Sequence, residues 1–118
     1  MPLVRFSIAL LLCVSVAAIT GCGEPPGPTG TDPEALYQHH CARCHARAGE
    51  PGGPTLGGSK GPDLSHIGSA TGMTADWIAA YVANPKSVRP DARLMPAFGD
   101  KMTPEQIRAL AEWLAARK

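Results

Sequence analysis

The chain has 118 residues, of which 44% are hydrophobic and only 5% aromatic, and its formal net charge at pH 7 is +1. This length allows one small domain beside any leader segment. Because the charges nearly cancel and basic residues do not cluster, the composition argues against a nucleic-acid partner. With 13 glycines and 12 prolines, the chain can build only a modest apolar core by itself.

Residues 1–21 are predicted to form a signal peptide. Arg5 places a positive charge before a mostly apolar stretch of 14 residues from Phe6 to Ile19. That stretch is short for a membrane span and typical of the apolar part of an export signal. We therefore expect a mature protein outside the cytoplasm, on the periplasmic side of a bacterial cell envelope.

This leader ends in Ile-Thr-Gly-Cys at residues 19–22, which resembles the bacterial lipobox. The resemblance implies that Cys22 is lipidated and becomes the new N-terminus, and two or three acyl chains give stable membrane attachment. The alternative is an ordinary cleaved signal with a chance cysteine. The lipidated Cys22 and a Pro/Gly linker would occupy residues 22–31, which we expect to act as a tether. Residues 32–118 are predicted to form one domain.

The first predicted helix begins at Asp32-Pro33-Glu34, where Asp can cap, Pro suits the first position and Glu complements the helix dipole. We expect it to continue to Cys41 and to lead into Cys-Ala-Arg-Cys-His at residues 41–45. This C-x-x-C-H pattern is the attachment signature of c-type haem. Two thiols one helical turn apart can form thioethers with one porphyrin, and the adjacent histidine can ligate its iron.

The pattern therefore predicts one covalent haem c, bound through Cys41 and Cys44, with His45 as an axial ligand. A structural zinc site would need a second ligand pair. The other two cysteines, Cys13 and Cys22, belong to the leader region and supply none. A thioredoxin-like site would need neighbouring strands, and the sequence has no strand pattern there.

Further along the chain, residues 46–61 contain six glycines and two prolines and are expected to form a loop along one haem edge. A helix is predicted over 74–83, ended by Asn-Pro, with Met73 and Ile78 spaced for a hydrophobic staple. Residues 86–99 are expected to be irregular.

The clearest helix signal lies at the C-terminal end. Residues 103–106, Thr-Pro-Glu-Gln, form a capping box with proline at the first helical position. Apolar residues follow at helical spacing, namely Ile107, Leu110, Ala111 and Leu114. No strand or internal repeat is evident, so the fold class is predicted to be all-α.

Haem iron needs a second axial ligand or keeps an open site. Met95 is our prediction, because it lies in a proline-containing loop between apolar neighbours, and a thioether ligand raises the reduction potential. Simple core packing is the alternative role for Met95. His66, after a glycine-rich loop, is the main competitor, with a surface or propionate-side role as its alternative. The full set of candidates is Met95, Met73, Met102, His39, His40 and His66.

Residues 32–118 resemble the class I c-type cytochromes. The order matches that family: a helix ending in C-x-x-C-H, a Gly-Pro-Asp-Leu turn at 61–64, a helix ending in Asn-Pro, a Met-Pro loop at 95–96 and an amphipathic last helix. A similar order of motifs, with similar residues in them, occurs in cytochrome c domains of some terminal-oxidase subunits. The resemblance implies an all-α class I cytochrome c fold with three to four helices around one covalent haem and crossing N- and C-terminal helices.

The same resemblance assigns two further contacts. The carbonyl of Pro62 would accept the N–H of the His45 imidazole, which fixes the tautomer of that ring. Tyr37 and Trp113 would meet where the first and last helices cross.

We expect the protein to be a one-electron carrier of a bacterial respiratory or related redox chain, rather than an enzyme, with protein donors and acceptors. Cations in the loops could steer acidic partners, although scattered solubilising charge explains them equally well. Three alternatives remain open: a haem c subunit of a larger oxidoreductase, a peroxidase or gas sensor with an exchangeable ligand, and a copper-handling protein. The cations concerned are Lys60, Lys86, Arg89, Arg93 and Lys101.

Overall fold

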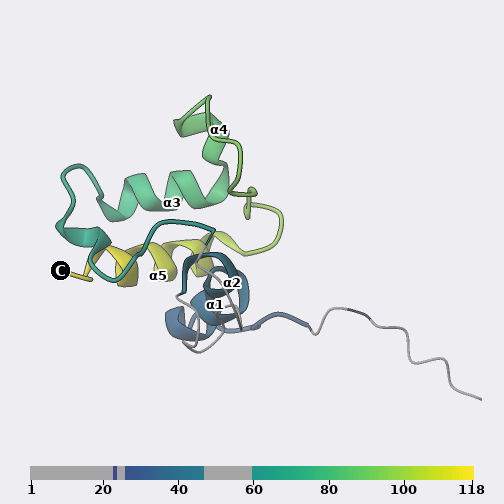
Figure 1. Cartoon of the computed structure of the whole chain (residues 1–118). Helices are drawn as coiled ribbons and strands as arrows, with labels where there is room; N and C mark the ends of the chain where they lie inside the picture. Colours follow the sequence, from purple (N-terminus) through teal and green to yellow (C-terminus); the bar gives the residue numbers. More distant parts are fainter. Residues whose placement is uncertain (1–22, 24–25, 47–59) are drawn as a thin grey trace, which may run out of the picture.

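The structure is a computed structural model, and it describes residues 23, 26–46 and 60–118. The predicted signal peptide, Cys22 and most of the glycine-rich loop lie outside these residues. Within them the chain forms five α-helices and one short 3-10 helix and no strand, as expected for an all-α protein. The elements are α1 Pro33–His40, α2 Ala42–His45, η1 Ile67–Ser69, α3 Ala75–Ala83, α4 Pro85–Val88 and α5 Pro104–Ala115 (Figure 1).

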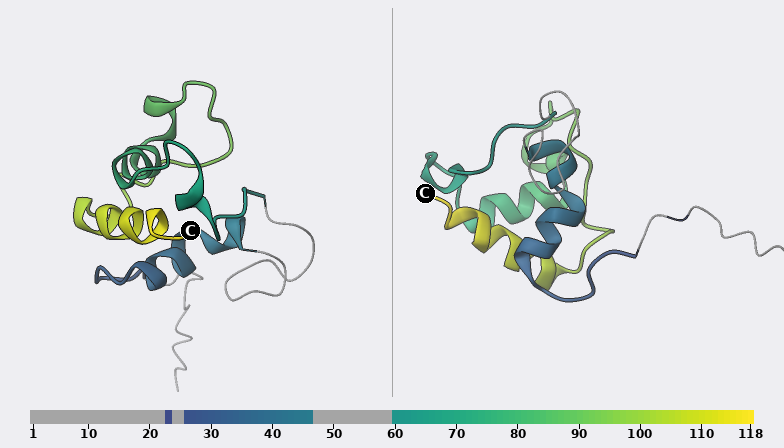
Figure 2. Two further views of the ribbon diagram at one scale, coloured as in Figure 1. Left: turned by 90° about the vertical axis from the view of Figure 1, so that its left-hand side faces the viewer. Right: turned by 60° about the horizontal axis from the view of Figure 1, so that its bottom comes forward.

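Helix α5 is the centre of the packing. It contacts α3 on one side, α1 on the other and η1 near its C-terminal end, and the second set of views shows it between α3 and α1 (Figure 2). Its predicted capping box is confirmed, with the Thr103 hydroxyl and the Gln106 side chain each bonding the other's backbone. Leu110 and Ala111 are fully buried, and a buried leucine contributes about 1.5–3 kcal/mol.

The first and last helices meet through aromatic side chains, as the resemblance implied. The ring centroids of Tyr37 and Trp113 lie 5.6 Å apart in a tilted arrangement. The guanidinium of Arg117 lies 4.5 Å from the Trp113 ring centroid. Tyr37 is buried and Trp113 half-buried, so this contact joins α1 to the end of α5 and positions the helix that leads into the motif at residues 41–45.

Two helix boundaries differ from the expectation. The first helix ends at His40, and residues 42–45 form the separate turn α2, because Cys41 adopts φ −115° at the junction. The segment expected to be irregular, residues 86–99, begins inside a short helix, α4 Pro85–Val88, since Pro85 suits the first helical position after extended Asn84.

The Pro/Gly segment before α1 also differs from a free tether. The side chain of Gln106 donates hydrogen bonds to the carbonyls of Pro28 and Gly30, at 2.9 and 3.0 Å. The last residues of the predicted linker are therefore bound to the domain. None of the described helices is long and apolar enough to cross a membrane.

The turn η1 packs against the end of α5 at Gly68. The amide of Gly68 donates to the carbonyl of Arg117 at 2.8 Å, and a Cβ at this position would overlap the carbonyl of Ala115. Only glycine allows this close approach, so Gly68 is the residue that lets η1 pack against the end of α5.

We expect Gly68→Ala to lower the free energy of unfolding by about 1–3 kcal/mol, because the added methyl forces the two backbones apart. Denaturant unfolding of the holoprotein measures this. Gly30→Ala is the matched control, since its Cβ would meet nothing within 4 Å. Equal stability of the two variants would contradict the packing described for η1.

Candidate functional site

The two cysteines of the motif lie one turn apart on the α1–α2 corner. The amides of Cys44 and His45 both donate to the carbonyl of Cys41, each at 3.0 Å. Cys41 is 5% exposed and Cys44 is partly exposed, and neither is in a disulfide. The corner therefore holds two free thiols and an imidazole within one helical turn.

Burial raises the pKa of the Cys41 thiol to about 12, and the neighbouring Cys44 adds to the shift. Cys41 is thus a neutral thiol at pH 7. Because a thiolate is the form that attacks disulfides, this environment does not favour a redox-active dithiol. Among the described residues, no group of three or more His, Cys, Asp or Glu side chains could hold a metal ion.

Among the residues that the structure describes, the His45 imidazole has a hydrogen-bond partner at one ring nitrogen. Its Nδ1 lies 2.8 Å from the carbonyl oxygen of Pro62. A carbonyl can only accept, so Nδ1 carries the proton and Nε2 keeps the lone pair in the neutral ring. This is the state in which a histidine ligates a metal, with the second nitrogen setting its orientation.

Gly61 gives the imidazole its space. A Cβ on Gly61 would lie 2.5 Å from Cε1 and 2.6 Å from Nδ1 of His45. The Gly61 amide also donates to the carbonyl of Cys44 at 2.7 Å. Our sequence reasoning did not assign a role to Gly61, and its position directly before Pro62 was the available signal.

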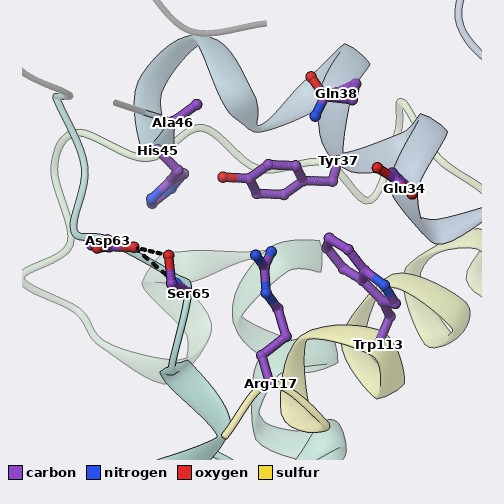
Figure 3. A pocket seen from close by; sticks show the side chains of 9 residues that line it. All are labelled: Glu34, Tyr37, Gln38, His45, Ala46, Asp63, Ser65, Trp113 and Arg117. Atoms are coloured by element: carbon purple, nitrogen blue, oxygen red, sulfur yellow. Dashed lines mark hydrogen bonds between the residues drawn. The ribbon is translucent and has the colours of Figure 1, made fainter. Parts of the chain in front are cut away.

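The turn after Pro62 holds that carbonyl in place. The carboxylate of Asp63 accepts from the amide of Ser65 at 2.9 Å and from its hydroxyl at 2.6 Å, as Figure 3 shows. Leu64 between them is buried. An Asp that bonds the backbone two residues on is a common turn device, so the acceptor of His45 sits on an anchored loop.

His45 also lines a polar cavity of about 270 Å³ between α1, α2 and the end of α5 (Figure 3). Charged side chains of both signs, including Glu34, Asp63 and Arg117, border it. A porphyrin needs a larger and mostly apolar site. This cavity therefore does not suit haem.

Met95 lies in the segment between α4 and α5. It is half-buried and packs against the apolar core. The segment is tied to the end of α3, because the amides of Phe98 and Gly99 donate to the last carbonyls of that helix, both at 3.0 Å. Leu94 beside it is 89% exposed, which makes it the one large apolar side chain exposed in the described part of the chain.

The competing candidates for the second axial ligand make other contacts in the structure. Met102 is 4% exposed in the core, and Met73 packs against the core from outside. Nδ1 of His66 lies 2.8 Å from the backbone oxygen of Lys118. The rings of His39 and His40 lie 4.6 Å apart, edge to face. Contacts of this kind give each of these side chains a structural role that does not involve a haem iron.

Comparison with known proteins defines the class to which this fold and site belong. Residues 28–114 match the family model described as cytochrome c oxidase, cbb3-type, subunit III. The chain is also 35% identical over 98 residues to cytochrome c2 iso-1 of Magnetospirillum fulvum, covering 73% of this chain and 97% of that protein.

The chain therefore belongs to the class I c-type cytochromes, whose members bind haem c, typically one per domain of this size. The residues present fit this cofactor. They supply two unpaired thiols at the motif and an imidazole whose Nε2 keeps its lone pair because Pro62 occupies Nδ1.

We expect Gly61→Ala to displace the His45 ring and to weaken its bond to Pro62, because the new methyl would occupy the imidazole's space. The fraction of purified chains that carry haem should fall, and the visible spectrum of the remainder should change. Gly30→Ala again serves as control. Full haem content with an unchanged spectrum would show that Gly61 does not constrain the ring.

Proposed function

We propose that this protein is a one-electron carrier whose haem c is attached through Cys41 and Cys44 and ligated by His45 and Met95. The observation that supports the ligand assignment most directly is the contact of His45 Nδ1 with the Pro62 oxygen, at 2.8 Å. It leaves Nε2 as the nitrogen available to iron. A carbonyl acceptor also raises the donor strength of the imidazole.

Haem c, when bound, supplies reversible one-electron chemistry. The chain's own residues hold and tune it. His45 is fixed in one tautomer, and Met95 offers a soft, neutral sulfur that favours the ferrous state. If His45 and Met95 both held the haem iron, no position would be left for a substrate, so we propose a carrier rather than an enzyme.

We further propose an exported, membrane-anchored protein. Residues 1–21 would be a signal peptide, residues 22–31 the lipidated Cys22 and its linker, and residues 32–118 the monohaem domain. The apolar leader and the Thr-Gly-Cys before the linker support this. The protein would work on the periplasmic side of the membrane, with redox proteins as donor and acceptor.

A second candidate function is a haem c subunit of a larger oxidoreductase. The matching family model describes an oxidase subunit, and that observation favours this candidate specifically. Gentle solubilisation of membranes separates the two. A carrier should elute alone as a small haem protein, whereas a subunit should remain with a larger complex.

The test of the proposed function is the mass and the visible spectrum of the purified mature protein. We expect the mass of residues 22–118 plus one haem and the acyl groups, and a reduced spectrum that carbon monoxide does not change. A haem that acid-acetone extracts, or rapid carbon monoxide binding, would contradict covalent attachment or a filled sixth position, respectively.

We expect Met95→Leu to lower the reduction potential or to open the iron to carbon monoxide, because it removes the sulfur at nearly constant volume. Met102→Leu is the matched control, since Met102 is buried in the core and should leave the potential unchanged. Redox titration with spectroscopic detection measures both. If only the Met102 variant changed the potential, the sixth ligand would be Met102.

A further inference from the structure

A side chain of α5 binds the segment before α1 to the domain. Gln106 is 6% exposed, and its amide nitrogen donates to the carbonyls of Pro28 and Gly30. Its amide oxygen accepts from the backbone N–H of Thr103 at 3.0 Å. Every hydrogen-bonding group of the Gln106 amide is directed at a named partner, so this is a specific contact between α5 and residues 26–31, which we call the arm.

The arm runs back along α1 toward the haem motif. A Cβ on Gly27 would lie 3.1 Å from Nε2 of His39, so the arm passes directly against a ring two residues before Cys41. His40 packs edge-on against Phe98, with centroids 5.7 Å apart. The arm therefore leaves the domain beside the corner that carries the attachment cysteines.

We propose that the arm holds this corner of the domain against the membrane surface, an inference that rests on the proposed anchor at Cys22. Pro28 follows Cys22 by only six positions, and that stretch spans at most about 20 Å. A linker free up to Asp32 would reach about 35 Å. The bound arm thus shortens the tether and selects the face that meets the lipid.

That face, formed by the arm with the half-buried His39 and His40, also carries an exposed cation beside the buried Phe98. The Nζ of Lys101 lies 5.5 Å from the Phe98 ring centroid, where it can contact anionic headgroups. The electron partner that such an arrangement fits is a redox protein held in the same membrane, because the attachment corner stays within reach of the bilayer.

Gln106→Glu tests the arm without removing the helix cap. The carboxylate keeps an oxygen for the amide of Thr103, as in the usual capping box, but has no donor for the arm carbonyls. A nitroxide is attached at Thr29→Cys, an exposed position, in the mature holoprotein. We expect an immobile label when Gln106 is present and a mobile label in the Gln106→Glu variant.

Thr103→Ala is the matched control. It removes the acceptor of the Gln106 backbone N–H but leaves both bonds from the Gln106 side chain to the arm. This variant should unfold at a lower denaturant concentration and keep the label immobile. A label that is equally mobile with Gln106 and in the Gln106→Glu variant would overturn the bound arm.

Membrane placement is tested in vesicles that carry a Ni²⁺-chelating lipid, with the haem reduced. Nitroxides at Glu105→Cys and Ser69→Cys report on opposite ends of α5, since η1 packs at its C-terminal end. We expect stronger relaxation by Ni²⁺ at position 105, and loss of that difference in Gln106→Glu. Equal relaxation at both positions in the wild type would overturn the orientation while leaving the anchor intact.

Failure of the anchor itself gives a different result. A mature protein without lipid mass that does not bind vesicles would overturn the anchor at Cys22, and the membrane placement with it. The immobile label at position 29 would in that case still identify the arm as part of the folded domain.

Discussion

The hydrogen bond between His45 and the carbonyl of Pro62 is the constraint on which the site depends. It spans 17 residues of sequence, and three local features make it possible: a glycine that leaves room for the ring, a proline that presents its carbonyl, and an aspartate that closes the following turn. Without this bond, neither the tautomer of His45 nor the direction of its Nε2 would be defined. The C-x-x-C-H sequence alone would then not orient the imidazole.

The packing of the helices also positions the corner between α1 and α2, where the two cysteines and His45 lie. Helix α5 buries four apolar residues, Ile107, Leu110, Ala111 and Leu114. It contacts α1 through the Tyr37–Trp113 pair. Because α1 leads directly into Cys41, the position of the thiols is set by a helix from the other end of the chain. A chain with few aromatic residues buries little apolar surface by itself. A large apolar cofactor beside this corner would therefore add to the apolar core.

The sequence predicted those parts of the fold whose causes are local. Helices α1, α3 and α5 each begin at a side-chain cap that the residues themselves provide, and the attachment motif is contiguous. What the local pattern missed depends on distant partners. The break at Cys41 and the role of Gly61 require the tertiary arrangement, and the contact of Gln106 with Pro28 crosses 78 residues. The Pro62 and Tyr37–Trp113 contacts came from family resemblance rather than from periodicity.

The arm shows why a Pro/Gly-rich segment need not be a free linker. Ordering one residue costs about 1–2 kcal/mol of backbone entropy, and a hydrogen bond returns about 0.5–1.5 kcal/mol. Two bonds from Gln106 could not order six flexible residues. Proline, however, fixes φ and reduces the freedom that the unfolded chain has to lose. Pro26 and Pro28 lie in the arm and Pro33 lies just after it. They restrict the unfolded chain as well, so folding loses less backbone entropy in this segment. Glutamine instead of glutamate at the third position of α5 then has a physical reason, because only the amide both caps the helix and donates to the arm.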